Sequence, residues 1–208
     1  MEDKQKIPLK NEIYRKLIHL FAIVIPIIYL FISKPLMILL SGLFMLSMIE
    51  LDVLKQKYKG VANIYNKYLG DVLRYSEKDF KKRKFTGGTY LSIGAFITVL
   101  FFEKNIAISA MIIMIVSDSF SAIVGKSIGK IKIFQKTLEG TLVFFIAGLL
   151  LILFVTPKMT PFPEEVYSAI IALAICTVLD VIPFNLDDNV LIPVSFAFFY
   201  SLFFSLLT

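Results

Sequence analysis

Seven long apolar blocks divide this chain, and they constrain its fold more than any other feature. The blocks cover residues 17–31, 36–51, 86–102, 106–124, 138–155, 166–183 and 190–207. Each block has roughly 15–20 residues, which is enough for a helix to cross a hydrocarbon core about 30 Å thick. Because backbone polar groups inside lipid must be satisfied within each segment, such blocks form helices. The sequence therefore predicts an all-α integral membrane protein, a bundle of about seven transmembrane helices.

The composition agrees with this fold class. Hydrophobic residues make up 57% of the chain, and its mean hydropathy is +0.78, more apolar than a soluble core requires. The first block follows a charged start and lacks a small-residue cleavage site, so we expect it to be retained. Cys176 lies inside an apolar block and, as the single cysteine, excludes an internal disulfide or a cysteine metal cluster. We expect residues 1–208 to form a single transmembrane domain.

The basic residues indicate how this bundle lies in the membrane. With the N-terminus inside and the blocks alternating in direction, only Lys34, Lys104 and Lys158 of the 22 basic residues lie outside. This strong positive-inside bias predicts a multi-pass protein with a cytoplasmic N-terminus and an outer C-terminus. The net charge of +6 therefore reflects topology, and we expect no nucleic-acid partner.

The long connection at residues 52–85 faces the cytoplasm in this topology. Its apolar residues recur at helical spacing, which predicts a basic amphipathic helix lying in the membrane interface. The apolar stripe consists of Leu54, Tyr58, Val61, Tyr65, Tyr68 and Val72. The basic run at 81–84 is typical of a topology anchor, and attraction of an anionic substrate is the alternative.

Ionisable residues within apolar blocks are candidates for function, because a carboxylate is costly to bury in a membrane. Asp118 is the clearest case, and it lies between Ser117 and the small, polar stripe of Ser121, Gly125 and Gly129. The GxxxG spacing of the two glycines is also typical of close helix packing. Packing does not account for the aspartate.

The stretch at 125–130, which contains both glycines, places lysines beside flexible backbone, an arrangement that can cradle phosphates. Lys126 and Lys130 belong to it, and Lys136, Glu139 and Gly140 follow at the start of the fifth block. The spacing is not that of a P-loop. The glutamate also fits a helix dipole, which favours an acidic residue in the first turn.

Two further clusters occur at the same depth. Asp187, Asp188 and Asn189 precede the last block, where they suit either a Mg²⁺ site or a helix cap, and Asp180 lies upstream. Near the first block, Arg15, Lys16 and His19 accompany Glu12 at spacings that place pairs on shared helix faces. The two cations also fit an inner topology flank, and the histidine fits a satisfied interior position. Glu50 lies at matching depth on the second block.

All these groups lie at the cytoplasmic ends of their blocks. A nucleotide arrives from the cytosol, and the hydroxyl of a lipid alcohol lies at headgroup level, so one interfacial pocket could hold both. Phosphoryl transfer needs mainly positioning, charge neutralisation and a carboxylate to accept the hydroxyl proton. A transporter would place its polar groups near the midplane instead.

At these residues the sequence resembles the polyprenol kinase family, which comprises dolichol kinases, phytol kinases and CTP-dependent diacylglycerol kinases and is distantly related to phosphatidate cytidylyltransferases. The resemblance covers nearly the whole chain. It is carried by RKLIH at 15–19, FTGGTY at 85–90, SDSFSAIVGKSIGK at 117–130, KTLEG at 136–140 and LDDN at 186–189.

The resemblance implies CTP as phosphate donor, Mg²⁺ as cofactor and a long-chain lipid alcohol as acceptor, within a membrane-lipid environment. Arg15, Lys16, Asp118 and Gly125 match residues that are essential in the family. Family members often have a glutamate where this chain has Asp180, so this position departs from the family pattern.

Three sets of site residues are therefore expected. The catalytic residues are Arg15, Lys16, Asp118, Asp187 and Asp188, and the three aspartates are also the expected metal ligands. The nucleotide-binding residues are Ser117, Ser121, Gly125, Lys126, Gly129, Lys136, Glu139, Gly140 and Asn189. The residues expected to bind the lipid alcohol are His19, Glu50, Gly87 and Gly88.

Two other functions stay open at this point. A cytidylyltransferase would join CMP to a phospholipid with the same polar groups, and a non-enzymatic membrane transporter or scaffold would need no Mg²⁺-dependent nucleotide binding. The acceptor stays open among dolichol or another polyprenol, a shorter isoprenoid alcohol and diacylglycerol, and so does the formation of a homo-oligomer.

Overall fold

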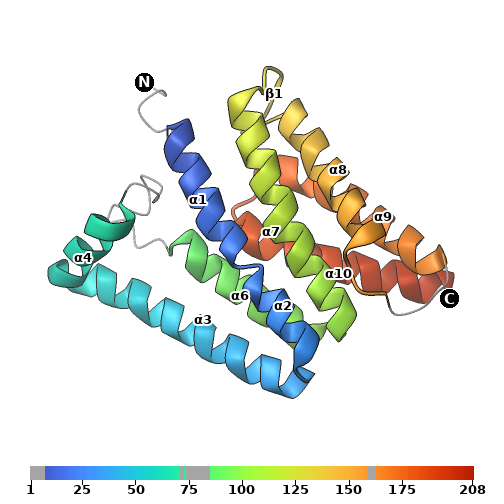
Figure 1. The fold of residues 1–208 in the computed structure, drawn as a ribbon, viewed down its shortest axis with the longest axis horizontal. Coiled ribbons are helices and arrows are strands. Elements are labelled where there is room, and N and C mark those ends of the chain that lie inside the picture. The colour runs from blue at the N-terminus through green and yellow to red at the C-terminus, as the bar shows by residue number, and fades with distance from the viewer. Residues whose placement is uncertain (1–7, 71–72, 74–84, 159–162) are drawn as a thin grey trace.

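The computed structural model describes residues 8–70, 73, 85–158 and 163–208, and helices make up 82% of them. The helices are α1 (Leu9–Phe21), α2 (Val24–Phe31), α3 (Lys34–Lys57), α4 (Lys59–Leu69), α6 (Gly87–Phe101), α7 (Lys104–Ser127), α8 (Leu138–Phe154), α9 (Pro163–Val181) and α10 (Asp188–Leu207) (Figure 1). A short antiparallel pair, β1 (Lys132–Ile133) and β2 (Lys136–Thr137), joins α7 to α8. The expected all-α class is confirmed.

Four helical stretches in the described part of the chain are long and apolar enough to cross a membrane. They are Leu9–Phe31, Lys34–Lys57, Lys104–Ser127 and Asp188–Leu207. Gly87–Phe101 and Leu138–Phe154 are apolar but shorter, at 15 and 17 residues. The chain is therefore a helical protein of membrane type, and the number of seven spans stays a prediction.

Pro26 divides the first of these stretches into α1 and α2. A proline ring clashes with the carbonyl four residues earlier and donates no backbone hydrogen bond, so the helix cannot continue regularly through it. The N–H groups of Ala22 and Ile23 instead donate to His19 and Leu20, three residues back, at 3.0 Å. The resulting turn lies midway along the stretch, between α1 and α2 (Figure 1).

The prediction of a single amphipathic helix in the 52–85 connection is wrong in one respect. Tyr58 has extended backbone angles of φ −117° and ψ 116°, so the apolar stripe is divided between the end of α3 and the separate helix α4. Tyr68, near the end of α4, is 76% exposed. Val72 and the basic run at 81–84 lie outside the described residues.

Helix α7 lies at the centre of the bundle, and 78% of the residues in its 18-residue apolar stretch are buried. Its neighbours are α1, α2, α6, α8 and α10. One buried apolar cluster joins α7 to α8, α9 and α10, and a second joins it to α2, α3 and α6. A polar residue on α7 is therefore surrounded by protein, and Asp118 is such a residue.

Two glycines allow helices to approach each other closely at the end of the bundle that carries the polar residues. A Cβ on Gly140 would lie 2.9 Å from the carbonyl oxygen of Ser121 and 3.2 Å from the Cα of Gly125. A Cβ on Gly94 would lie 2.1 Å from the carbonyl oxygen of Asn189. The close packing that a GxxxG motif suggests thus involves Gly125 with Gly140 on α8.

Candidate functional site

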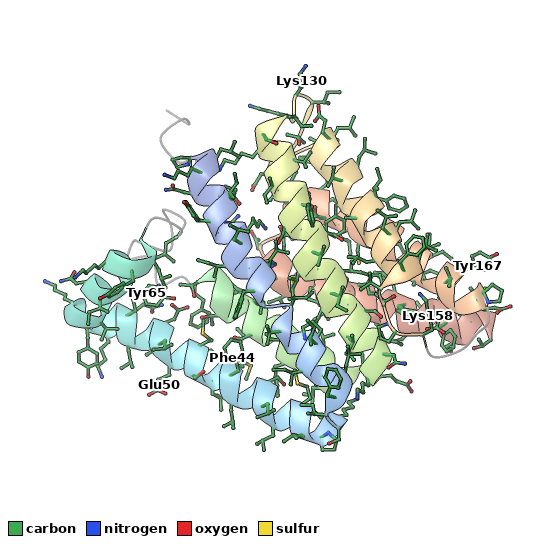
Figure 2. The ribbon with its side chains drawn as sticks, in the orientation of Figure 1. Phe44, Glu50, Tyr65, Lys130, Lys158 and Tyr167 are labelled. Carbon is green, nitrogen blue, oxygen red and sulfur yellow. The ribbon has the colours of Figure 1, made fainter. Side chains whose placement is uncertain are left out.

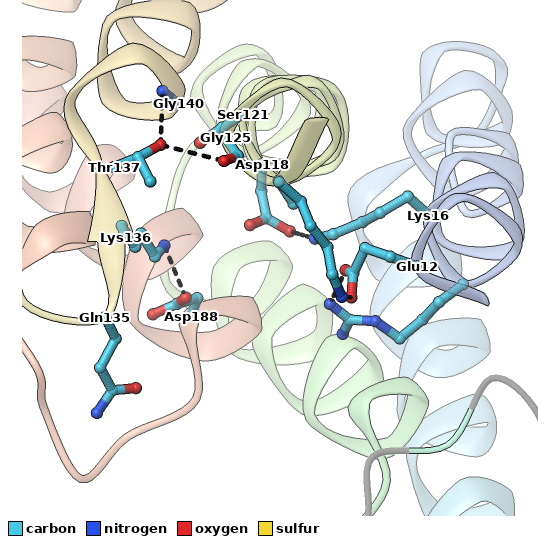
Figure 3. A pocket seen from close by; sticks show the side chains of 13 residues that line it. Glu12, Lys16, Asp118, Ser121, Gly125, Gln135, Lys136, Thr137, Gly140 and Asp188 are labelled. Carbon is cyan, nitrogen blue, oxygen red and sulfur yellow. Dashed lines mark hydrogen bonds and ion pairs between the residues drawn. The ribbon is translucent and has the colours of Figure 1, made fainter. Parts of the chain in front are cut away.

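A polar cavity of about 340 Å³ lies where α1, α7, β2, α8 and α10 meet (Figure 3). The residues that line the cavity come from segments up to 176 positions apart in the chain, from Glu12 to Asp188. The lining residues are Glu12, Arg15, Lys16, Asp118, Ser121, Ala122, Gly125, Lys126, Gln135, Lys136, Thr137, Gly140 and Asp188.

An ion pair between Lys16 and Asp118 joins α1 to the central helix (Figure 3). Both side chains are buried. The Nε2 atom of His19, one helical turn after Lys16, lies 3.8 Å from Asp118 Oδ2. Sequence analysis selected all three residues, and the fold brings them together because α1 packs directly on α7.

Glu12 pairs with two further cations that line this cavity. It forms an ion pair with Arg15 on its own helix, and its Oε2 lies 3.3 Å from the Nζ of Lys126 at the end of α7. Glu12 is itself buried. The i, i+3 spacing was a visible signal for the pair with Arg15, whereas the approach of Lys126 depends on the crossing of α1 and α7.

Lys136 bridges two carboxylates on the opposite wall. Its ammonium contacts Asp180 at the end of α9 and lies 3.0 Å from Asp188 Oδ2 at the start of α10. Burial lowers the pKa of Lys136, but the carboxylates of Asp180, Asp188 and Asp118 outweigh that effect and raise the pKa above its ordinary value. Lys136 therefore carries its positive charge throughout the physiological pH range.

Asp118, Asp180 and Asp188 could together hold a divalent cation. Among the described residues, ligand oxygens of these three lie within 4.8 Å of one another. Asp180 is only 2% exposed, and its Oδ2 has no hydrogen-bond partner in the described part of the chain. A buried carboxylate oxygen without a partner is costly, and a hard cation such as Mg²⁺ accepts such oxygens as ligands. The donor set therefore fits the implied metal.

Asp187 takes a different position from the one expected for a metal ligand. Its Oδ1 accepts hydrogen bonds from the backbone N–H of Asn189 at 3.1 Å and from the Asn189 side chain at 2.7 Å. This is an N-cap of α10, the alternative that sequence analysis left open. The neighbouring Asp188 instead pairs with Lys136, so two adjacent aspartates make different contacts in the structure.

The remaining expected nucleotide residues divide into two groups. Ser121, Gly125, Lys126 and Gly140 line the polar cavity, whereas Ser117, Gly129 and Glu139 are absent from its lining. Glu139 instead accepts hydrogen bonds from the backbone N–H groups of Lys130 and Ile131, at 2.8 and 3.3 Å, and so holds the turn after α7. Gly129 packs against Thr137.

An apolar groove of about 470 Å³ adjoins the polar cavity. Its lining includes the expected lipid-binding residues His19, Gly87 and Gly88, together with Asn189. Arg15, Lys16, Asp118 and Asp188 line both hollows. The two spaces therefore meet at one charged junction.

Glu50 lies outside both hollows, contrary to its expected role. It is exposed and points away from the bundle on α3 (Figure 2). The buried carboxylate of α3 is Asp52, two residues later. Asp52 Oδ2 accepts hydrogen bonds from the Thr86 N–H at 2.7 Å and from the Thr89 hydroxyl at 2.6 Å. It thereby holds the start of α6, where Gly87 and Gly88 line the groove.

Sequence analysis missed Asp52, and it also missed Thr137 and Gln135. Asp52 directly follows an apolar block, three residues before Lys55, and this i, i+3 spacing was a usable signal. Thr137 precedes an apolar block, as N-cap residues do, and its hydroxyl accepts the N–H of Gly140 at 3.2 Å. No local pattern distinguishes Gln135.

We expect Asp52→Asn to destabilise the protein by about 3 kcal/mol, because breaking a buried ion pair leaves an uncompensated charge. The partner is Lys55, whose Nζ lies 3.1 Å from Asp52 Oδ1 and 4.8 Å from the centre of the Tyr65 ring. Thermal unfolding in detergent measures the loss. Glu50→Gln on the exposed face is the matched control, and its expected change is within about 0.5 kcal/mol. Equal shifts for both variants would contradict the role assigned to Asp52.

Comparison with known proteins adds a distant relationship. The chain is 28% identical over 192 residues to an uncharacterized protein of Rickettsia prowazekii, which covers 91% of this chain and 93% of that protein. It is 29% identical over 193 residues to an uncharacterized protein of Methanocaldococcus jannaschii, with coverage of 90% and 92%. It is also 28% identical over 158 residues to CTP-dependent diacylglycerol kinase 1 of Schizosaccharomyces pombe, with coverage of 69% and 70%. No family model and no solved structure matches the chain.

Proposed function

We propose that this protein is a CTP-dependent kinase that phosphorylates a membrane lipid alcohol at the cytoplasmic face. The observation that carries this proposal is the junction of the two hollows. A polar cavity and an apolar groove share Arg15, Lys16, Asp118 and Asp188. A reaction between a soluble, highly charged donor and a lipid acceptor needs such a meeting of two environments.

The similarity to the fission yeast protein supports the same reaction class. That relative is named for the use of CTP and for diacylglycerol kinase activity, and 69% of this chain aligns with it. The resemblance of motifs described above points in the same direction. Both lines of support concern lipid phosphorylation, and neither selects one acceptor.

The charges of the cavity suit a nucleoside triphosphate bound with Mg²⁺. Arg15, Lys16, Lys126 and Lys136 would neutralise phosphate oxygens, because all four line the polar cavity. Asp118, Asp180 and Asp188 would hold the Mg²⁺, which supplies neutralisation of the triphosphate charge when it is bound.

The transfer itself requires few covalent changes. The hydroxyl oxygen of the lipid attacks the γ-phosphorus of CTP, and the bond from that phosphorus to the bridging oxygen breaks. CDP leaves with the bonding electrons, the hydroxyl proton passes to a carboxylate of the cavity, and a lipid phosphate is formed. The residues of this chain contribute mainly by holding the two reactants in line.

The acceptor within this class is a polyprenol such as dolichol, another isoprenoid alcohol or diacylglycerol. In the topology that we propose, seven spans place the N-terminus and the cavity in the cytoplasm and the C-terminus outside. The basic residues of the N-terminal region, the 52–85 connection and the turn after α7 then face the cytosol, consistent with the positive-inside rule.

CTP labelled at either the α- or the γ-phosphate tests this function directly. We expect purified protein with Mg²⁺ and a panel of lipid alcohols to transfer label to lipid from the γ position only. The alcohol that becomes labelled identifies the acceptor. Transfer from the α position to a phospholipid would instead establish a cytidylyltransferase, and absence of transfer from both positions would favour a non-enzymatic membrane protein.

A further inference from the structure

We propose that the apolar groove between α1–α2 and α3 holds the hydrocarbon tail of the lipid alcohol and so sets the position of its hydroxyl. This inference rests on the kinase function proposed above and deepens it. It assigns Gly88, on the side of the groove formed by α6, as the residue whose missing side chain keeps the groove open. The occupant is one aliphatic tail of a lipid that carries a free hydroxyl group.

The arrangement of the helices forms a space of the right kind. Figure 1 shows that α1–α2 and α3 diverge from the turn that joins them. Helix α1 packs on α7, and α3 packs on α6, so the walls of the groove rest on different neighbours. Leu91 of α6 is buried at the groove, while Phe21 and Phe44 on the two walls are 76% and 41% exposed. The groove therefore communicates with the surface that faces lipid.

The polar end of the groove suits a hydroxyl group. Lys16, His19 and Asp118 all line it, and His19 Nε2 is buried without a hydrogen-bond partner among the described residues. Such an atom can donate to or accept from an alcohol. Beyond this end the lining is apolar, with residues of α1, α2, α3 and α4. A lipid tail placed there would bring its hydroxyl to the junction with the nucleotide cavity.

The groove would contribute to the orientation of the lipid more than to its binding energy. A tail that moves from the bilayer into the groove gains little hydrophobic free energy, because lipid tails are as apolar as leucine side chains. The gain is in orientation, since a held tail restricts the hydroxyl to one place beside the γ-phosphate. We therefore expect obstruction of the groove to lower kcat/KM for long-tailed acceptors and to leave the binding of CTP unchanged.

Gly88 provides a precise way to obstruct the groove. A Cβ at this position would lie 2.9 Å from the Cε of Met48, the mobile end of a flexible side chain. The substitution Gly88→Leu should therefore fold and fill part of the space, and Gly88→Ala should fill less. Gly60 on α4 is the matched control, because a Cβ there meets no atom within 4 Å and the residue is outside the groove lining.

The first test compares long-tailed and short-tailed alcohols with the same headgroup. We expect Gly88→Leu to lower kcat/KM for the long-tailed acceptor by about 10- to 100-fold, with an intermediate loss for Gly88→Ala. The short-tailed acceptor, the affinity for CTP and all values for Gly60→Leu should change by about twofold or less. Equal losses for both acceptors, or no loss for either, would overturn the groove assignment.

A second test does not depend on catalysis. A lipid alcohol with a photoactivatable diazirine in its tail should crosslink to residues of α2 and α3 that line the groove in wild-type protein and in Gly60→Leu, and much less in Gly88→Leu. The same probe with its hydroxyl methylated should crosslink weakly. Equal labelling by both probes would mean that the groove holds any membrane lipid, which overturns the inference. If wild-type protein labels as expected but transfers no phosphate, the kinase proposal fails and the groove assignment stands.

Discussion

Asp118→Asn is expected to reduce phosphate transfer by about 10³-fold or more, the range observed when a charged group that stabilises phosphoryl transfer is removed. Asp118 lines both the polar cavity and the apolar groove, forms an ion pair with Lys16 and contributes to the three-carboxylate cluster. The asparagine side chain has nearly the same shape but carries no charge. Labelled CTP and a lipid alcohol measure the loss of transfer.

This variant also breaks a buried ion pair, so a loss of stability must be separated from a loss of chemistry. Glu165→Gln is the matched control. Glu165 is 1% exposed and accepts a hydrogen bond from the Tyr200 hydroxyl at 2.8 Å. It lies 15 residues before Asp180 on α9, about 22 Å along the helix.

We expect both variants to lower the melting temperature and only Asp118→Asn to lose transfer. An active, folded Asp118→Asn protein would refute the central role of this residue.

The second large effect is expected for Asp180→Asn, which should weaken nucleotide binding, whereas Asp187→Asn should leave it unchanged. Asp180 belongs to the carboxylate cluster and has an unpartnered buried oxygen, so its replacement should weaken Mg²⁺-dependent CTP binding by about 10- to 100-fold. Asp187 caps α10, and asparagine is about as good an N-cap as aspartate. Asp187→Asn should therefore retain binding and transfer.

Titration of labelled CTP against Mg²⁺ concentration distinguishes the two variants. Asp187→Ala removes the cap and should cost about 0.5–2 kcal/mol of stability while the requirement for Mg²⁺ stays as in the wild type. Loss of Mg²⁺ dependence in Asp187→Asn, together with normal behaviour of Asp180→Asn, would reverse the assignment and restore Asp187 as the metal ligand.

Pairs of neighbouring residues show where sequence reasoning succeeds and where it stops. Glu50 and Asp52 lie two residues apart on α3, which is about 200° around a helix, so one faces outward and the other inward. Both have the same charge and occur at the same depth. The pattern of apolar residues along α3 was too uniform to indicate which face is buried, and the expected role went to Glu50, which is exposed.

The length and order of the apolar blocks, by contrast, determined the helical class, because the need to satisfy backbone hydrogen bonds in lipid acts within each segment. Local charge and motif patterns also pointed to Asp118, Lys16 and Lys136. Tertiary structure decided which groups meet: Asp180 joins the cluster and Asp187 does not, and Gly125 packs on Gly140. These contacts depend on the rotation and crossing of helices that are distant in the chain. Packing across the whole bundle sets that rotation, so no single segment encodes it.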